Sequence, residues 1–306
     1  MKHSVLFLLI LSWAAPLWAD GPGTSGGDLL KSPPGVRPAA LAGTYASLGD
    51  DVYVIGFNPA GLTRVAKFSV GIDHVQGLAG IQTEAMSVAV PTHKLGMVGI
   101  QVQYRHMPNI NNELATDPVV KAGDFLLTLA MARQYGHFSI GLGFKTLYSV
   151  LAEKKALANA FDFGGGYLWR GIQFSAVAQN IGTSVKYQPN AQASDPLPMT
   201  FRLGACRTFI ATRQAVLLGA VEADHVRDEG LQQSVGVEYW HRTLIALRAG
   251  YRHGATDSFA TGFSLGAAIR NGIGRVEYEV GYTWKPSHVD TGYTLNNHLF
   301  GLLIWY

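Results

Sequence analysis

The sequence has few charged residues, one cysteine and, beyond its N-terminus, no second long apolar run. Charged residues make up 15% of the chain and hydrophobic residues 48%, whereas ordinary soluble domains have about 25% charged residues. The single cysteine, Cys206, excludes an internal disulfide and lies in a strand-like pattern as a small hydrophobe. A net charge of +3 is too small to indicate a nucleic-acid partner. The apolar residues must therefore be spread over many short segments.

The one long apolar run lies at the N-terminus, from Val5 to Ala15, directly after a basic start at Lys2. A basic start, an apolar run and small residues near Ala19 are typical of a secretory signal peptide. We expect cleavage after Ala19, which makes residues 1–19 the signal peptide. The run is too short for the ~20 apolar residues that a membrane-spanning helix needs. A lipid anchor is not expected, because no cysteine lies near the junction.

From about residue 67 onward, apolar residues alternate with small or polar ones, the period of a strand with two unlike faces. In the segment 137–149, for example, Phe138, Ile140 and Leu142 alternate with Ser139, Gly141 and Gly143. The pattern predicts about fourteen strands of about ten residues each, the length of a tilted membrane-spanning strand. They lie near residues 67–76, 82–91, 96–107, 124–134, 137–149, 160–169, 172–181, 199–210, 214–227, 232–240, 244–253, 259–270, 274–285 and 297–306.

The connections between these strands alternate in length. If the first strand starts in the periplasm, the connections on that side are short, at residues 92–95, 135–136, 170–171, 211–213, 241–243 and 271–273. Those on the other side include the longer polar segments 108–123, 182–198 and 286–296. Bacterial outer-membrane barrels are built in this way. In a soluble β-sandwich, nothing requires short and long connections to alternate along the chain. We predict an all-β fold, a transmembrane antiparallel β-barrel of about 14 strands over residues 67–306, located in the outer membrane.

Charged residues recur on the polar face of consecutive predicted strands. A charge on the lipid face would cost ~2–4 kcal/mol near the membrane midplane, so we expect these side chains in the lumen. We interpret them as a charge network that braces the interior, in preference to a ligand site. They are Glu222, Asp224, Glu238, Arg248, Arg252, Arg270, Glu277 and Glu279.

Aromatic residues fall near strand ends, where interfacial girdles are expected: Tyr167, Trp169, Tyr239, Trp240, Tyr251, Tyr282 and Trp284. The last predicted strand carries Phe300, Leu302, Ile304 and Tyr306 on one face and ends at Tyr306. A terminal aromatic on an alternating strand is the usual signal for the barrel-assembly machinery, which we therefore expect as a partner, together with outer-membrane lipid.

Residues 20–66 do not have the strand pattern. A small apolar stretch follows Pro38, which suits a first helical turn, and the run Asn58, Pro59, Ala60, Gly61 indicates a tight turn. We predict a hatch with short helices inside the lumen. The four turn residues are candidates for plug or gating contacts; a purely structural turn is the alternative.

Two segments of the hatch, GVRPAALAGTYASLGDD at 35–51 and FNPAGL at 57–62, resemble the N-terminal signature of FadL-like and PorV/PorQ-like outer-membrane proteins. FDFG at 161–164, QNIG at 179–182, PMTFRLG at 198–204 and ALRAGYR at 246–252 are similar to that group too. The resemblance implies a fourteen-stranded barrel with the hatch folded inside. In the FadL-like branch it implies passive uptake of long-chain fatty acids or other hydrophobic molecules, which leave sideways through a gap at a strand kink. In the PorV-like branch it implies a component of type IX secretion or surface assembly, with secreted proteins as partners.

We expect a channel for a hydrophobic small molecule or fatty acid, with the secretion or assembly role as the alternative. An outer-membrane hydrolase would need a serine or carboxylate beside a histidine. The ten histidines are scattered without such a pair or a metal-ligand cluster. We therefore expect no enzymatic activity, no metal and no cofactor.

Overall fold

The computed structural model describes residues 21, 23–77, 80–92, 94–108, 110–111, 119–152, 154–187, 194–254, 262–288 and 294–306. The predicted signal peptide, residues 1–19, lies outside the described residues. No helix within the described part of the chain is long and apolar enough to span a membrane.

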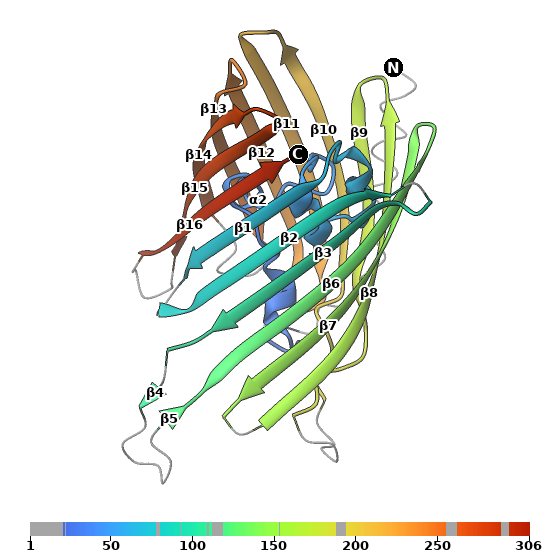
Figure 1. Ribbon diagram of the computed structural model, residues 1–306. Helices are drawn as coiled ribbons and strands as arrows, with labels where there is room; N and C mark the ends of the chain where they lie inside the picture. Colours follow the sequence, from blue (N-terminus) through green and yellow to red (C-terminus); the bar gives the residue numbers. More distant parts are fainter. Residues whose placement is uncertain are drawn as a thin grey trace.

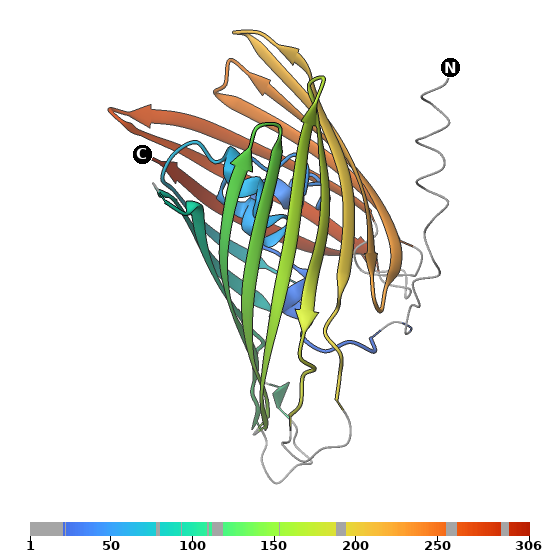
Figure 2. The ribbon, with the colours of Figure 1, turned by 90° about the vertical axis from the view of Figure 1, so that its right-hand side faces the viewer.

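Fourteen antiparallel strands form a closed barrel in chain order, and β1 pairs with β16 to close it. Figures 1 and 2 show strongly tilted strands around a central lumen. This confirms the predicted fold class. The barrel strands are β1 (Ser69–Gln76), β2 (Gln82–Thr92), β3 (Gly96–His106), β6 (Ala122–Tyr135), β7 (Phe138–Leu151), β8 (Lys154–Trp169), β9 (Ile172–Gly182), β10 (Thr200–Ala211), β11 (Ala215–Val226), β12 (Gly230–His241), β13 (Ile245–Gly254), β14 (Gly262–Ile273), β15 (Val276–His288) and β16 (Thr294–Trp305); β4 (Ile110–Asn111) and β5 (Val119–Val120) pair separately.

Each strand overlaps its predicted range, and every boundary except the start of β8 lies within about three residues of the prediction. Strand β8 begins at Lys154 rather than near residue 160. The turn after β14 lies at residues 274–275 rather than 271–273, because Gly274 takes the left-handed conformation, with φ 64°. Strand alternation continues through both differences, so hydropathy alone does not mark the ends.

The two ends of the barrel differ. The "short-turn end" carries the brief connections after β2, β6, β8, β10, β12 and β14 together with the C-terminus, at the top of Figure 1. The "long-loop end" carries the remaining connections. Between the ends, apolar side chains point outward: Phe138, Ile140 and Leu142 are more than half exposed. Apolar residues outside and polar residues inside are the arrangement of transmembrane barrels.

One expected girdle residue points the other way. Trp240 is buried, and the guanidinium of Arg270 lies 4.2 Å from its ring centroid. The girdle prediction for Trp240 is wrong because its neighbour Tyr239 must point to the opposite face of the strand.

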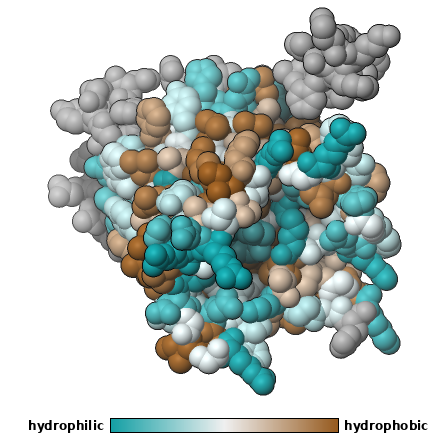
Figure 3. All heavy atoms as spheres, turned by 90° about the horizontal axis from the view of Figure 1, so that it is seen from above, coloured by the Kyte–Doolittle hydropathy of each residue, from teal (hydrophilic) through white to brown (hydrophobic). Residues whose placement is uncertain are grey.

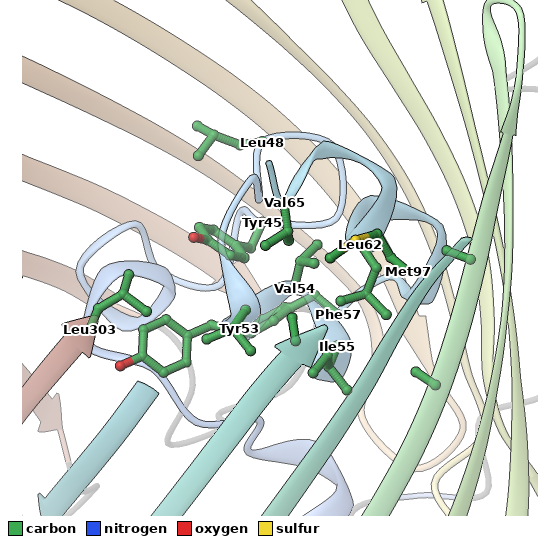
Figure 4. Packing of buried hydrophobic residues seen from close by; sticks show 14 of the residues in the cluster. Tyr45, Leu48, Tyr53, Val54, Ile55, Phe57, Leu62, Val65, Met97 and Leu303 are labelled. Carbon is green, nitrogen blue, oxygen red and sulfur yellow. The ribbon is translucent and has the colours of Figure 1, made fainter. Parts of the chain in front are cut away.

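The N-terminal segment forms a plug inside the barrel, shown in blue in Figures 1 and 2. It contains η1 (Asp28–Lys31), α2 (Val36–Ala40), η2 (Val52–Gly56) and η3 (Pro59–Arg64). Its apolar side chains form the main hydrophobic cluster, in which Tyr45, Val54, Ile55 and Leu62 are fully buried. Figure 4 shows these side chains converging between η2 and η3, with Met97 and Leu303 reaching them from the wall.

Candidate functional site

Asn58 anchors the turn at the start of η3. Its Oδ1 accepts a hydrogen bond from the Ala60 amide at 3.0 Å and so caps η3. Its Nδ2 donates to the Ala46 carbonyl within the plug at 2.9 Å and to the Gly165 carbonyl of β8 at 3.3 Å. With only 1% of its surface exposed, Asn58 joins two plug segments to the barrel wall.

Two wall glycines allow the turn to approach the strands this closely. A Cβ atom at Gly141 of β7 would overlap the Pro59–Ala60 peptide, and one at Gly164 of β8 would overlap Asn58 Oδ1. Gly61 is needed for a related reason, because a Cβ there would overlap Val54 within the plug. The predicted turn residues Asn58, Pro59, Ala60 and Gly61 are therefore all buried against β7, β8 or the plug core.

A second anchor is Arg37, on α2. Its Nε and Nη2 donate to the two carboxylate oxygens of Glu238 on β12, each at 2.7 Å. Its Nη1 contacts Asp50 and donates to Asp51 at 3.1 Å. Bidentate pairing fixes orientation as well as distance, so this guanidinium sets the position of α2 against both the wall and the rest of the plug.

The plug groups around Arg37 lie in a poorly solvated environment. Burial raises the pKa of Asp51, and the charge of Arg37 partly opposes that rise. Burial also raises the pKa of Tyr45 well above its ordinary value, so its hydroxyl stays neutral and donates to Asp51. Removing Arg37 would therefore leave a buried carboxylate without its cation.

The structure brings seven of the eight predicted lumen charges together in ion pairs on the inner wall. Arg248 bridges Glu238 at 2.6 Å and Glu279 at 2.7 Å, and Glu279 also pairs with Arg270 at 2.9 Å. A second group joins Glu222 to Arg202 at 2.9 Å and Asp224 to Arg252 at 3.0 Å.

The second group of charges also holds the plug backbone. Glu222 accepts from the amides of Tyr45 and Ala46, and Arg252 donates to the Ala42 carbonyl. Glu277 lies apart from these pairs: it is half exposed at the short-turn end and pairs with Lys67 at 3.0 Å.

The wall has an irregular step between β8 and β9. Phe161 pairs with Ile181 and Phe163 with Ala178, so β9 holds one extra residue, a β-bulge. Asn180 takes a left-handed conformation there, with φ 60°. Its amide donates to Asp162, and Lys145 pairs with Asp162 at 2.7 Å.

The bulge is linked to the plug by Gln179. Its Nε2 donates to the Gly56 carbonyl at 3.0 Å, and its Oε1 accepts from Arg202 at 2.8 Å. Arg202 in turn pairs with Glu222, which holds the Tyr45 and Ala46 amides. A continuous polar chain therefore connects the step in the wall to two segments of the plug.

An apolar depression of about 530 Å³ lies in the wall beside this step, across β8, β9 and β10. Small residues form its floor, and bulky outward-facing side chains border it. The lining residues are Phe163, Gly164, Gly165, Ala176, Val177, Ala178, Phe201, Arg202 and Leu203. Gly164 and Gly165 separate it from Asn58, so the depression and the plug turn lie on opposite sides of a wall that has no side-chain bulk there.

Nearer the long-loop end, the lumen is apolar and η1 fills it. Leu29 and Leu30 are buried in a second hydrophobic cluster with inward residues that include Leu126, Leu147 and Ala158. Lys31 holds η1 in place through Asp228, at 2.7 Å, and Glu229 in the β11–β12 connection. η1 thus occupies a lumen region in which apolar side chains of the strands surround it.

Several of these residues were not singled out from the sequence. Arg37, Lys145, Asp162 and Arg202 carry key contacts, yet none was among the predicted site residues. Lys145, Asp162 and Arg202 lie on the polar face of predicted strands, so the alternation that located Glu222 could have located them too. Nothing in the sequence pairs Arg37 with Glu238, which lies 201 residues away. Within the described residues, no group of three or more His, Cys, Asp or Glu side chains is placed to hold a metal ion.

The predicted assembly-signal residues lie on β16 and just beyond it. Phe300 and Tyr306 are more than half exposed on the outer face. The Tyr306 amide donates to the Phe68 carbonyl at 3.0 Å, so the last residue is held beside the first strand where the barrel closes.

Comparison with solved structures finds several with a similar fold. The structure is similar to the Ralstonia pickettii toluene transporter TbuX (TM-score 0.60, 10% identity, covering 88% of this chain and 97% of that chain). It is also similar to the Pseudomonas putida toluene transporter TodX (TM-score 0.57, 10% identity, covering 95% of this chain and 98% of that chain). A Pseudomonas aeruginosa FadL homologue is similar too (TM-score 0.53, 10% identity, covering 89% of this chain and 97% of that chain). No protein-family model matches the sequence, and no curated protein sequence matches it.

At this identity, the comparisons establish the architecture. The barrel with its internal plug has the FadL-like fold, as the sequence resemblance predicted.

Proposed function

We propose that the protein is an outer-membrane channel for passive uptake of hydrophobic molecules, with residues 20–66 as the plug and residues 67–306 as the barrel, released from a signal peptide at 1–19. The observation that carries the proposal is the apolar depression at β8–β10, which is backed by the Asn58 turn across a glycine wall. A depression of about 530 Å³ lies within the usual range for small-molecule sites.

The proposed route enters at the long-loop end and leaves sideways through the wall. A hydrophobic molecule displaces Leu29 and Leu30 from the apolar lumen cluster, then reaches the inner side of the Gly164–Gly165 wall. Because the β8–β9 ladder is already interrupted at Asn180, opening the wall there breaks fewer backbone hydrogen bonds than opening an uninterrupted ladder. The molecule then enters the outer leaflet or mid-membrane without passing a polar exit.

Asn58, Pro59, Ala60 and Gly61 are the proposed gating residues. Asn58 bonds to both the plug and β8, so a shift of the plug pulls on the wall at the proposed exit. The lumen ion pairs brace the inner wall during that shift. Long-chain fatty acids and monoaromatic hydrocarbons are the proposed substrate classes; toluene is named for the transporters TbuX and TodX.

Uptake of labelled fatty acid and labelled toluene by cells that lack other such channels tests the proposal. Cells expressing the protein should take up at least one of the two faster than empty-vector cells, and an Asn58→Ala, Pro59→Ala variant should change that rate at equal barrel levels. No uptake above the empty vector by the wild type would reject transport. A secretion or surface-assembly role would then be tested by the amount of protein displayed on the cell surface.

A further inference from the structure

The short turns of the barrel carry a ring of positive charge. Five of the six turns at the short-turn end contain one lysine or arginine and no acidic residue: Lys94, Arg170, Arg213, Arg242 and Arg275. The sixth turn, at residues 136–137, is preceded by Arg133. All of these side chains are exposed. We refer to these six residues together with Arg207 as the "basic rim".

None of the basic-rim cations has a carboxylate partner among the described residues, whereas Lys31 and Arg105 at the opposite end do. Lys31 pairs there with Asp228 and Glu229, and Arg105 pairs with Asp28. At the short-turn end, Glu277 already pairs with Lys67. The rim therefore presents positive charge that no carboxylate of the described residues pairs with.

The rim also reaches onto the outer wall of the barrel. Arg133 shares the outward-facing row of Met131, and Arg207 that of Leu203, at the ends of β6 and β10. Arg133 lies 5.6 Å from the Tyr135 ring centroid, and Arg170 lies 5.2 Å from that of Trp169. Tyrosine and tryptophan are enriched at the level of lipid headgroups. The cations therefore lie at the level of the lipid phosphates. They are not confined to the turns, where a soluble partner could approach.

Figure 3 looks down on the short-turn end. Hydrophilic side chains project from several points around the edge, with hydrophobic ones between them, rather than forming a single patch. A ring of this kind suits many small anions spaced around the barrel better than it suits one protein docked on one side.

We propose that the basic rim binds the phosphate headgroups of anionic phospholipids in the leaflet at the short-turn end of the barrel. Arginine binds phosphate oxygens through paired N–H donors, and clustered cations beside a membrane attract anionic lipids. The rim would hold the barrel at a defined depth and surround it with acidic lipid. This role depends on membrane insertion and not on transport, so it stands or fails separately from the proposed channel.

Native mass spectrometry of the full-length protein, extracted in mild detergent and delipidated, tests the proposal. The protein is titrated with phosphatidylglycerol or with phosphatidylcholine, and the bound lipids are counted. The wild type should prefer phosphatidylglycerol, by about fivefold for each cation that a headgroup engages.

Two quadruple variants carry the same change in charge. The first replaces Arg170, Arg213, Arg242 and Arg275 with Gln and should lose most of the preference for phosphatidylglycerol. The second replaces Lys121, Lys154, Lys155 and Lys186 at the long-loop end with Gln and should keep that preference. Heat-modifiable migration on a gel confirms that each barrel is folded. Should the first variant fail to fold, the single variants Arg213→Gln and Arg242→Gln should each show a partial loss.

Equal binding of both lipids by the wild type would overturn the proposal and would favour an acidic protein as the partner of the rim. An equal loss of preference in both quadruple variants would also overturn it, because total charge would then explain the binding without the rim.

Discussion

Arg37 of the plug donates hydrogen bonds to both carboxylate oxygens of Glu238 on β12, each at 2.7 Å. Glu238 is fully buried and also accepts from Arg248 at 2.6 Å. A single carboxylate on the wall therefore lies between the plug and the ion pairs of the lumen. Removal of one member of a buried pair leaves the other charge uncompensated, which is more costly than the pair itself is stabilising.

The first prediction concerns Arg37. Arg37→Ala should lower the free energy of unfolding by about 3–5 kcal/mol, measured by urea titration of the heat-modifiable folded band. Lys67→Ala, which removes the exposed pair with Glu277, is the control and should cost below ~1 kcal/mol. Equal effects of the two variants would contradict the anchoring role of Arg37.

The second prediction concerns the glycine wall behind Asn58. Gly164→Ala should displace the plug turn, because its Cβ would overlap Asn58 Oδ1. Gly165→Ala is the matched control, since its Cβ would meet only the Ala176 carbonyl at 3.6 Å. Hydrogen exchange of the Ala60 amide, which Asn58 caps, should become faster in Gly164→Ala and stay unchanged in Gly165→Ala. Unchanged exchange in both would show that the close approach does not hold the turn.

The third prediction is a pH dependence of η1. Burial alone would raise the pKa of Asp228, but hydrogen bonds from Lys31 and Ser25 outweigh it and lower the pKa. A lowered carboxyl pKa in the folded state stabilises the contact above the unfolded pKa of about 3.9, and this stabilisation is lost as the pH falls through the folded pKa.

Acidification should therefore release η1. Protease cleavage near residues 23–31 should become faster as the pH falls below the usual Asp range, assayed with an acid-active protease on the folded barrel. Asp228→Asn should already be cleaved quickly at the highest pH at which the protease is active, with little further change on acidification. A wild type that stays protected at low pH would contradict the tether.

The barrel was predictable because lipid leaves little choice. Apolar and polar residues must alternate along every strand, and every backbone group must be paired within a closed sheet. The pattern of a segment such as 137–149 is therefore enough to predict a strand. Likewise, Glu222, Glu238 and Arg248 were predicted to point inward because the alternation of the strand decides the face.

The plug contacts were less predictable, since they join residues far apart in the sequence. The run from Asn58 to Gly61 indicates a turn, but not that Gly141 and Gly164 make room for it. The bulge at Asn180 also leaves no mark on the hydropathy pattern, because Gln179 and Asn180 are both polar and either could face inward. Local patterns specify faces and turns, whereas the position of the proposed exit depends on how the wall and plug pack.

The most direct test of the account is uptake of labelled toluene or fatty acid by cells in which the wall depression has been filled. Ala176→Trp with Ala178→Trp places two bulky side chains on its floor, and Val235→Trp on the outward face of β12 is the control at a distant position. At equal amounts of folded barrel, the account predicts that the wild type and Val235→Trp take up the label at the same rate, and that the double variant falls toward the empty-vector level. A double variant as fast as the wild type would contradict passage through the wall at β8–β10.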